Sequence, residues 1–356
     1  MTTTIPVEES AGRALLHDIT CIIPGEYKGA RFKKGHIIQK EDIPVLRSLG
    51  KEHIFVMECE PGMIHENDAA LRLARLCMGG GINAAPPSEG KIELFAASDG
   101  FFDVRCSAVT AINLTGELAV ASRRPFTWVH SGDKLAAVKA IPLFTTEEKL
   151  RNAEHIAGEE AIFSILPQKL QFAAIVVTGS EIAGGLVKDK FTPALEKKLY
   201  AFGITIVRRI VVKDGTANVA AAIHDCKKSL AAASDEGDAG IILCSGGMSV
   251  DPDDNTPAAI RQTADEVVTY GAPVFPGAMI MLAYLARGTP VCGLPGCVMF
   301  AKTTIFDVLL PFLLAGKRLT QEDFARMGLG GLCLGCVECS FPVCSFGAFA
   351  SKFSAL

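Results

Sequence analysis

The clearest pattern in the chain lies between Gln171 and Gly316, where short apolar runs alternate with stretches of helical spacing. Aliphatic runs that end at glycine are typical of strands covered on both faces. The segments that predict strands are Phe172–Thr178, Ile204–Val212, Ala239–Cys244 and Thr289–Gly293. The segments that predict helices are Asp189–Phe202, Thr216–Ala233, Thr256–Ala264 and Val298–Ala315. This alternation predicts an α/β fold with a doubly wound, mostly parallel sheet, whose ligands bind at the carboxyl ends of the strands.

The first half of the chain has a different pattern. Ile5–Asp18 and Lys40–Leu49 predict helices, whereas Lys91–Leu143 predicts short strands separated by turn residues. We therefore expect a smaller β-rich α+β domain, with a barrel as one arrangement. Thr145–Leu166 predicts a helix that links the halves. The predicted organisation is an N-terminal α/β segment at 1–65, the β-rich domain at 66–145, the linker helix at 146–170, the α/β domain at 171–318 and a cysteine-rich tail at 319–356.

Composition and charge narrow the class of protein. Hydrophobic residues make up 49% of the 356 residues and charged residues 21%, so the chain can bury a core and is not disordered. The formal net charge is -4, without the basic field that nucleic-acid binding needs. Lys302 and Asp307 interrupt the longest apolar stretch, Val298–Leu314, so we expect no membrane span. The N-terminus has no apolar run behind a basic start, so we expect a cytoplasmic protein.

Residues that favour anion binding follow the predicted strand Ala239–Cys244. Gly246 and Gly247 lack side chains, so backbone N–H groups there can approach a phosphate closely. The helix predicted to start near Thr256 directs its positive end into the same space. Ser245 and Ser249 add hydroxyl donors. These residues predict a site for an anionic ligand at this edge of the sheet.

Two carboxylates, Asp189 and Asp254, are candidates for catalysis beside this anion site. A carboxylate repels a phosphate unless it binds a cation or accepts hydrogen bonds from a pterin or a nucleobase. Mg²⁺ bridging phosphate oxygens to an aspartate would remove that repulsion. The alternative is that each aspartate caps the N-terminus of a helix. Glu181 is a third candidate, and its alternative is an exposed loop carboxylate.

Six motifs in a fixed order make the segment 171–316 resemble the molybdopterin-binding domain shared by molybdopterin adenylyltransferases and molybdopterin molybdenumtransferases. The motifs are Thr178-Gly179-Ser180-Glu181, Lys188-Asp189-Lys190, Ser245-Gly246-Gly247-Met248-Ser249-Val250, Asp254-Asn255-Thr256-Pro257, Pro276-Gly277 and Gly293-Leu294-Pro295-Gly296. The resemblance implies catalytic roles for Asp189, Asp254 and Glu181. It implies cofactor contacts at Thr178, Gly179, Ser180, Ser245, Gly246, Gly247, Ser249, Thr256, Pro295 and Gly296.

The resemblance implies a protein of molybdenum cofactor biosynthesis or delivery that binds molybdopterin or its adenylated form, with ATP, Mg²⁺ and molybdate as further ligands. An enzyme of this kind would catalyse nucleotidyl transfer or metal insertion. The alternatives are a carrier that loads the cofactor onto a molybdoenzyme, and a hydrolase of nucleotide pyrophosphates built on the same domain. Relatives commonly dimerise or trimerise, so a homo-oligomer is expected. Cys297 stands where the family usually has Asn, which departs from the metal-inserting pattern.

The tail concentrates cysteines. Cys333, Cys336, Cys339 and Cys344 are four of the 12 cysteines in the chain and lie within twelve residues. The C-x₂-C-x₂-C spacing lets thiolates converge on one centre, as in iron–sulfur ligation, and four thiolates also suit tetrahedral zinc. The fourth cysteine follows after four residues instead of the ferredoxin three. The tail therefore predicts an iron–sulfur cluster or a zinc site, with a reactive tail that holds no metal as the alternative.

Overall fold

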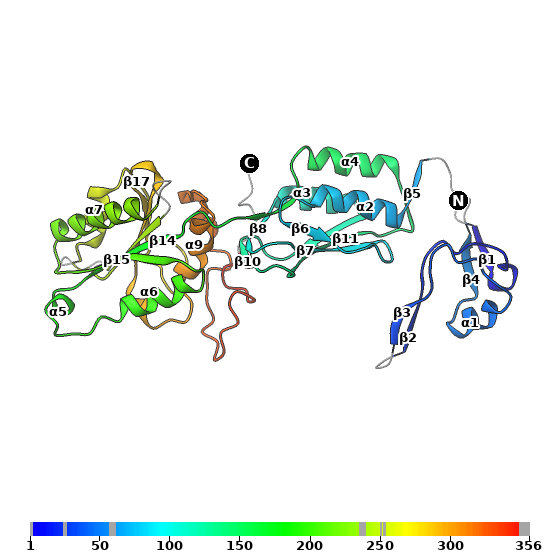
Figure 1. The fold of residues 1–356 in the computed structure, drawn as a ribbon, viewed down its shortest axis with the longest axis horizontal. Helices are drawn as coiled ribbons and strands as arrows, with labels where there is room; N and C mark the ends of the chain where they lie inside the picture. The colour runs from blue at the N-terminus through cyan, green and yellow to red at the C-terminus, as the bar shows by residue number, and fades with distance from the viewer. Residues whose placement is uncertain are drawn as a thin grey trace. The chain divides into compact units, whose positions relative to one another are not determined.

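The computed structural model describes residues 3–23, 27–56, 62–234, 240–249, 251 and 254–348, which form two compact units (Figure 1). Among these residues, unit 1 takes in 3–98, 104–123 and 130–165, and unit 2 takes in 99–103, 124–129 and 166–348. The chain therefore leaves unit 1 twice for short segments of unit 2 before the main α/β fold begins.

Unit 1 combines small antiparallel sheets with helices. Its strands are β1 (Thr3–Pro6), β2 (Ile19–Ile23), β3 (Tyr27–Phe32), β4 (His53–Val56), β5 (Met63–His65), β6 (Ile82–Ala84), β7 (Lys91–Ala96), β9 (Leu118–Ser122), β11 (Lys134–Ala140), β12 (Phe144–Thr146) and β13 (Phe163–Leu166). Its helices are η1 (Val7–Glu9), α1 (Asp42–Ser48), α2 (Glu66–Cys77), α3 (Cys106–Asn113) and α4 (Glu147–Ala157). The largest sheet has the order β6-β7-β11-β9, and α2 packs against β7 and β11. This sheet is open, so the barrel arrangement is wrong.

Two further differences from the sequence prediction concern helices in this unit. The helix predicted over Ile5–Asp18 is wrong, because β1 pairs with β4 and the 3₁₀ helix η1 follows. The Ser10 hydroxyl donates to the Val7 carbonyl at 2.5 Å, and Gly12 turns the chain with a φ of 83°. The segment predicted as β-rich also contains the helices α2 and α3, whose apolar sides pack on the sheet strands.

Unit 2 contains the predicted α/β fold. Its elements are β8 (Gly100–Val104), β10 (Thr127–Val129), β14 (Phe172–Thr178), α5 (Ser180–Ala183), α6 (Phe191–Tyr200), β15 (Thr205–Val212), α7 (Thr216–Ala233), β16 (Gly240–Ser245), α8 (Thr256–Thr263), β17 (Glu266–Tyr270), β18 (Met281–Tyr284), η2 (Ala286–Gly288), β19 (Pro290–Leu294), η3 (Gly296–Met299), α9 (Ile305–Leu314) and α10 (Gln321–Arg326). The sheet has the order β15-β14-β16-β19-β18-β17. The first four strands are parallel and the last two antiparallel, so the predicted doubly wound, mostly parallel sheet is confirmed.

The central strands of this sheet are buried on both faces. Ala173, Ile175 and Val177 of β14 pack with α6 and α9, whereas Ala174 and Val176 pack with α7 and α8. Figure 1 shows α7 and α6 on opposite sides of the sheet. Because helices cover both faces of the sheet, neither face of β14 or β16 is exposed to solvent. This explains why both strands are apolar runs without alternating polar residues.

The helix predicted over Val298–Ala315 is divided in the structure. The 3₁₀ helix η3 ends at Met299, and α9 begins only at Ile305. Thr304 and Asp307 form a capping box at the start of α9, which sets the boundary. The helix α10 follows, so α9 is not the last helix of the chain.

Asp307 also joins α9 to α6, because its Oδ1 lies 2.5 Å from Lys198 Nζ, and both side chains are at least four-fifths buried. We expect Asp307→Ala to lower the free energy of unfolding by about 2–4 kcal/mol, since it removes a cap and leaves a largely buried ammonium unpaired. Asp323→Ala is the control, because Asp323 forms the same capping box with Thr320 in α10 without an ion pair. It should cost about 1 kcal/mol. Equal losses in chemical denaturation would show that the ion pair contributes nothing.

Candidate functional site

The loops that follow three parallel strands begin at the same edge of the sheet. Val177 of β14 is paired with Ser245 of β16, and Ser245 is paired with Leu294 of β19. In the sheet, β15 lies next to β14 on one side and β16 lies next to it on the other. The strand order therefore reverses direction between β14 and β16. In open α/β sheets this is the point where a crevice forms and ligands bind.

The loop after β16, formed by residues 245–249, packs tightly against the end of β14; we call it the Gly-Gly loop. Gly246 has a φ of 93°, and a Cβ added there would lie 2.1 Å from the carbonyl oxygen of Thr178. Gly247 has a φ of 56°. The Thr256 hydroxyl donates to the Gly246 carbonyl at 2.8 Å, and the Thr256 backbone N–H donates to the Gly247 carbonyl at 3.2 Å. The two glycines are therefore held between the end of β14 and the first turn of α8.

Asp254 closes this loop from its far end. Its Oδ2 accepts the backbone N–H of Ser249 at 2.6 Å, and its own N–H donates to the Asp251 carbonyl at 2.9 Å. The helix α8 has Asn255 at its N-cap position with no capping bond from that side chain, and Pro257 stands in its first turn. Asp254 therefore holds the Gly-Gly loop and does not cap α8. Val250 and Pro252, two other positions of the predicted motif region, lie outside the described residues.

The Ser245 hydroxyl at the base of the loop is unpaired within the part of the chain that the structure describes. Ser245 is fully buried, and its Oγ makes no hydrogen bond to any described residue. An unpaired buried hydroxyl costs about 1–3 kcal/mol, so such a group indicates a missing ligand or water. This orphan atom lies at the point where β16 enters the Gly-Gly loop.

Asp214, which follows β15, is a site residue that the sequence analysis missed. Its Oδ2 accepts the Ser180 backbone N–H at 2.7 Å, and its Oδ1 accepts the Thr178 hydroxyl at 3.3 Å. Its pKa lies below the ordinary value, chiefly because the Ser180 side chain hydrogen-bonds to it. Asp214 therefore fixes the predicted cofactor-binding segment Thr178-Gly179-Ser180. The only sequence signal was an aspartate before glycine at the end of a strand, which is an ordinary turn pattern.

The other two predicted catalytic carboxylates have different surroundings. Asp189 Oδ1 accepts the backbone N–H groups of Phe191 and Thr192 at 2.8 and 3.1 Å, so it caps α6 as its alternative interpretation stated. Glu181 is exposed on the short helix α5. Among the residues that the structure describes, neither carboxylate is hydrogen-bonded to the Gly-Gly loop.

The loop after β19 leaves open space beside the sheet edge. Pro295 is buried, whereas Gly296 is exposed, and a Cβ added to Gly296 would meet no atom within 4 Å. Cys297, in place of the usual Asn, is half-buried, and burial raises the pKa of its thiol. This loop can therefore approach a ligand with its backbone, while Cys297 is not an activated thiol.

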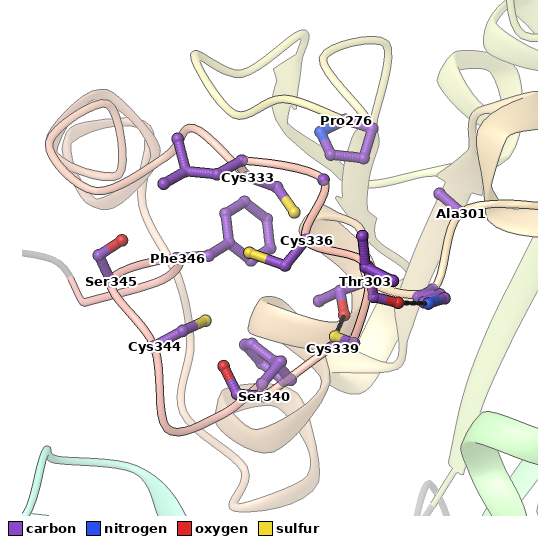
Figure 2. A pocket seen from close by; sticks show the side chains of 15 residues that line it. Pro276, Ala301, Thr303, Cys333, Cys336, Cys339, Ser340, Cys344, Ser345 and Phe346 are labelled. Atoms are coloured by element: carbon purple, nitrogen blue, oxygen red, sulfur yellow. Dashed lines mark hydrogen bonds between the residues drawn. The ribbon is translucent and has the colours of Figure 1, made fainter.

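The cysteines fall into two chemical groups. Cys244 and Cys292 are fully buried in the sheet, and burial raises the pKa of Cys292 to about 12, so these thiols are inert packing groups. In the tail, the Thr303 hydroxyl lies 3.2 Å from Cys339 Sγ, and this hydrogen bond lowers the pKa of the Cys339 thiol. All four tail cysteines line one cavity of about 400 Å³ (Figure 2). Within the described ranges, no three His, Cys, Asp or Glu side chains converge closely enough to hold a metal ion.

Comparison with known proteins matches two segments of the chain to family models. A family model described as "Probable molybdopterin binding domain" matches residues 174–315, and one described as "Domain of unknown function (DUF8806)" matches residues 4–58. No curated protein matches the chain. The segment 174–315 is therefore a molybdopterin-binding domain of the kind found in molybdenum cofactor biosynthesis proteins. The same chain also contains the segment that matches the DUF8806 model. In the described parts of the chain, no helix is both long and apolar enough to cross a membrane.

Solved structures with similarity to part of the chain include three cofactor biosynthesis proteins. The tungsten cofactor synthesizing protein MoaB from Pyrococcus furiosus is 17% identical, with a TM-score of 0.33, over 42% of this chain and 99% of that chain. The molybdopterin biosynthesis enzyme MoaB from Thermus thermophilus is 22% identical, with a TM-score of 0.34, over 42% and 98%. The molybdopterin biosynthesis Mog protein from Mycobacterium ulcerans is 23% identical, with a TM-score of 0.31, over 40% and 92%.

Two glycines of the site should respond differently to an added methyl group. Gly246→Ala should lower the free energy of unfolding by about 2–4 kcal/mol, because its φ is unfavourable and its Cβ collides with the Thr178 carbonyl. Gly296→Ala is the matched control and should change stability by less than about 1 kcal/mol, since nothing lies near its Cβ. Urea denaturation of both variants measures this. A tolerated alanine at 246 would contradict the described loop.

The lowered pKa of Asp214 makes its contribution depend on pH. Its carboxylate stabilises the fold at neutral pH, and this stability is lost as the pH falls through the depressed folded-state pKa. Asp214→Asn keeps an acceptor for the Ser180 N–H but removes the charge, so we expect a loss of about 1 kcal/mol at pH 7. At a pH below its depressed folded-state pKa, where the wild-type carboxyl is protonated, the two proteins should converge. A difference that stays constant as the pH falls from 7 to below that pKa would refute this role.

Proposed function

We propose that unit 2 binds the phosphate group of molybdopterin, or of a nucleotide joined to it, at the Gly-Gly loop. The observation that carries this proposal is the close approach of Gly246 to Thr178 beneath the first turn of α8, since it leaves backbone and helix dipoles at a sheet edge without side chains in the way. The family match over 174–315 and the unpartnered Ser245 hydroxyl support the same conclusion.

Asp254 has the position to organise the ligand. One of its oxygens holds the Ser249 N–H, and the other makes no hydrogen bond to a described residue. That oxygen can accept from a pterin N–H or bind Mg²⁺. Mg²⁺ at phosphate sites keeps several waters and takes only one or two protein carboxylates, so a single aspartate is a sufficient protein ligand. Bound Mg²⁺ would neutralise the phosphate charge that otherwise repels Asp254.

The reactions that such a site serves are nucleotidyl transfer to the pterin and metal insertion. In nucleotidyl transfer, a pterin phosphate oxygen attacks the α-phosphorus of ATP and pyrophosphate leaves, so the protein supplies no nucleophile. Its residues position two phosphate groups and stabilise the charge that develops on the leaving oxygens. In this proposal the Gly-Gly loop binds phosphate, Asp254 orients the ligand, and Asp214 keeps the loop after β14 in place.

A carrier of finished cofactor is the second candidate. It is favoured by Asp189, because Oδ1 of this predicted catalytic carboxylate accepts two backbone N–H groups at the N-terminus of α6. A carrier needs the phosphate site but no second carboxylate at the reacting atoms. Incubating the full chain with molybdopterin, Mg²⁺ and ATP separates these roles. Adenylated pterin and pyrophosphate, or bound molybdenum after molybdate is added, support an enzyme, whereas pterin binding without turnover supports a carrier.

We also propose that the protein works in a reducing compartment such as the cytoplasm. All the cysteines that the structure describes are free thiols, including the exposed Cys336 and Cys339. Exposed thiols persist where cellular reductants keep them from forming disulfides.

Asp254→Asn tests the proposed site without disturbing the loop, because the amide oxygen still accepts the Ser249 N–H. We expect adenylation or metal insertion to fall by about 10²-fold or more, since the charge that orients the phosphate complex is lost. If the protein is a carrier, the affinity for molybdopterin in the presence of Mg²⁺ should fall instead.

Asp225→Asn is the matched control, because Asp225 on α7 forms an exposed ion pair with Arg208 of β15 and its loss should leave both activities unchanged. Unfolding curves establish that both variants are folded. Unaltered turnover and binding in Asp254→Asn would remove Asp254 from the site. Nucleotide cleavage with no response to the pterin would replace the proposal with a pyrophosphate hydrolase.

A further inference from the structure

The cavity in the tail is bordered by all four cysteines of the C-x₂-C-x₂-C-x₄-C segment. Cys333, Cys336, Cys339 and Cys344 lie around it, with Lys302 and Thr303 from the loop before α9 forming one wall. Figure 2 shows these cysteine side chains arranged around the pocket, together with Phe346. The cysteines at the two ends of the segment pack partly against the core, while the middle two are exposed. The four thiols of this segment therefore border a single space.

The size of this space does not suit a single metal ion. Four thiolates bound to one zinc ion each lie about 2.3 Å from it, which brings the sulfurs close to one another. Within the described ranges no three candidate ligand side chains are close enough for that, although all four thiols border the same cavity. The cavity measures about 400 Å³, far more than the ~10–15 Å³ that one water molecule needs. Thiols that border one cavity without three of them meeting at one point match a polynuclear centre better than a mononuclear one, because in a cluster each sulfur binds a different metal atom.

The backbone of the tail is held in place around the cavity. Leu332 forms a parallel bridge with Phe275, through Cys333 N–H to the Phe275 carbonyl at 2.8 Å. Lys302 Nζ donates to the Val337 carbonyl at 2.6 Å, between the second and third cysteines. Arg124 Nη1 donates to the Phe346 carbonyl at 3.1 Å, just past the fourth. The thiols are thus presented from a fixed loop, which lowers the entropy cost of binding a ligand.

The charges around the cavity favour an anionic occupant with sulfur ligation. Its described lining contains no carboxylate and no imidazole, so cysteine supplies all the metal-binding side chains. Lys302 is the charged side chain of that lining, and the Thr303 hydroxyl hydrogen-bonds to Cys339. An iron–sulfur cluster with four thiolate ligands carries a net negative charge, which a lysine and hydrogen bonds to sulfur stabilise.

We propose that this cavity binds one [4Fe–4S] cluster, with Cys333, Cys336, Cys339 and Cys344 each ligating one iron. Each thiol releases its proton to solvent when it binds iron. The site is independent of the phosphate site proposed above, because it uses the tail and none of the residues of the Gly-Gly loop.

The cluster is tested on the full chain, produced with iron and purified without oxygen. We expect about four irons and four acid-labile sulfides per chain, with the broad visible absorption of a sulfide-bridged cluster. Cys336→Ser and Cys339→Ser alter exposed residues, so they should remain folded and lose at least half of the iron and sulfide. Cys21→Ser is the control, because this partly buried cysteine on β2 does not line the cavity, and it should keep the full content.

Several outcomes would overturn the assignment. One zinc per chain without sulfide would show a mononuclear site, two irons with two sulfides a smaller cluster, and no metal an unmetallated tail. Iron retained in both serine variants would place any cluster elsewhere. A full chain that contains the cluster but binds no pterin would reject the proposed function alone. A full chain that binds the pterin but contains no cluster would reject this inference alone.

Thr303→Val provides a readout that a purely structural role would not change. Its hydroxyl hydrogen-bonds to Cys339 Sγ, and such a bond stabilises the more negatively charged reduced cluster. The variant should keep its iron and sulfide, while its reduction potential shifts to a more negative value. An unchanged potential would show that Cys339 does not ligate the cluster.

Discussion

The contact between Gly246 and the Thr178 carbonyl is the constraint on which the ligand edge of this protein depends. Two parallel strands end side by side, and the loop that leaves β16 must pass so close to β14 that any side chain at residue 246 would collide with it. Because the loop lies so close, Thr256 can donate hydrogen bonds to the carbonyls of Gly246 and Gly247, and Asp254 can accept the N–H of Ser249 at the end of the loop. The phosphate site that we propose is therefore a consequence of strand packing, and its geometry is set by backbone atoms rather than by mobile side chains.

The sequence predicted the sheet better than it predicted the site. The strands β14 and β16 and the helix α7 were evident, because a strand covered on both faces must be a continuous apolar run and a long helix has a strong period. The antiparallel strands β17 and β18 were missed, since short edge pairs between glycines carry little periodic signal. The helix predicted over Ile5–Asp18 was wrong for the same reason. Its apolar residues pack into a small core from a strand and from turns, which carry little periodic signal.

For the candidate site, the sequence predicted the glycine loop that follows β16 at the edge of the sheet, but it could not show which groups the carboxylates contact. Asp189 and Asp254 each precede a helix, yet the first caps α6 whereas the second holds the loop that begins where β16 ends. Asp214 follows β15, a strand that carries none of the predicted motifs. It contacts the loop after β14 because β14 and β15 are paired in parallel. Which oxygen meets which N–H depends on this tertiary arrangement. The tail differs, because the spacing of its four cysteines already predicted an iron–sulfur cluster, a zinc site or a reactive tail that holds no metal.

Unit 2 is completed by two segments that precede its main sequence by dozens of residues. Phe126 stacks on Phe312 of α9 with ring centroids 4.3 Å apart, and Phe101 meets Trp128 at 4.8 Å within the same core. Lys317 also reaches back to Asp103, with Nζ 3.5 Å from Oδ2. The segment that matches the family model therefore lacks part of the core of unit 2. A piece of the chain cut at the boundary of that match would lose Phe101, Phe126 and Trp128, so transfer of unit 2 to another protein would also require the segments 99–103 and 124–129.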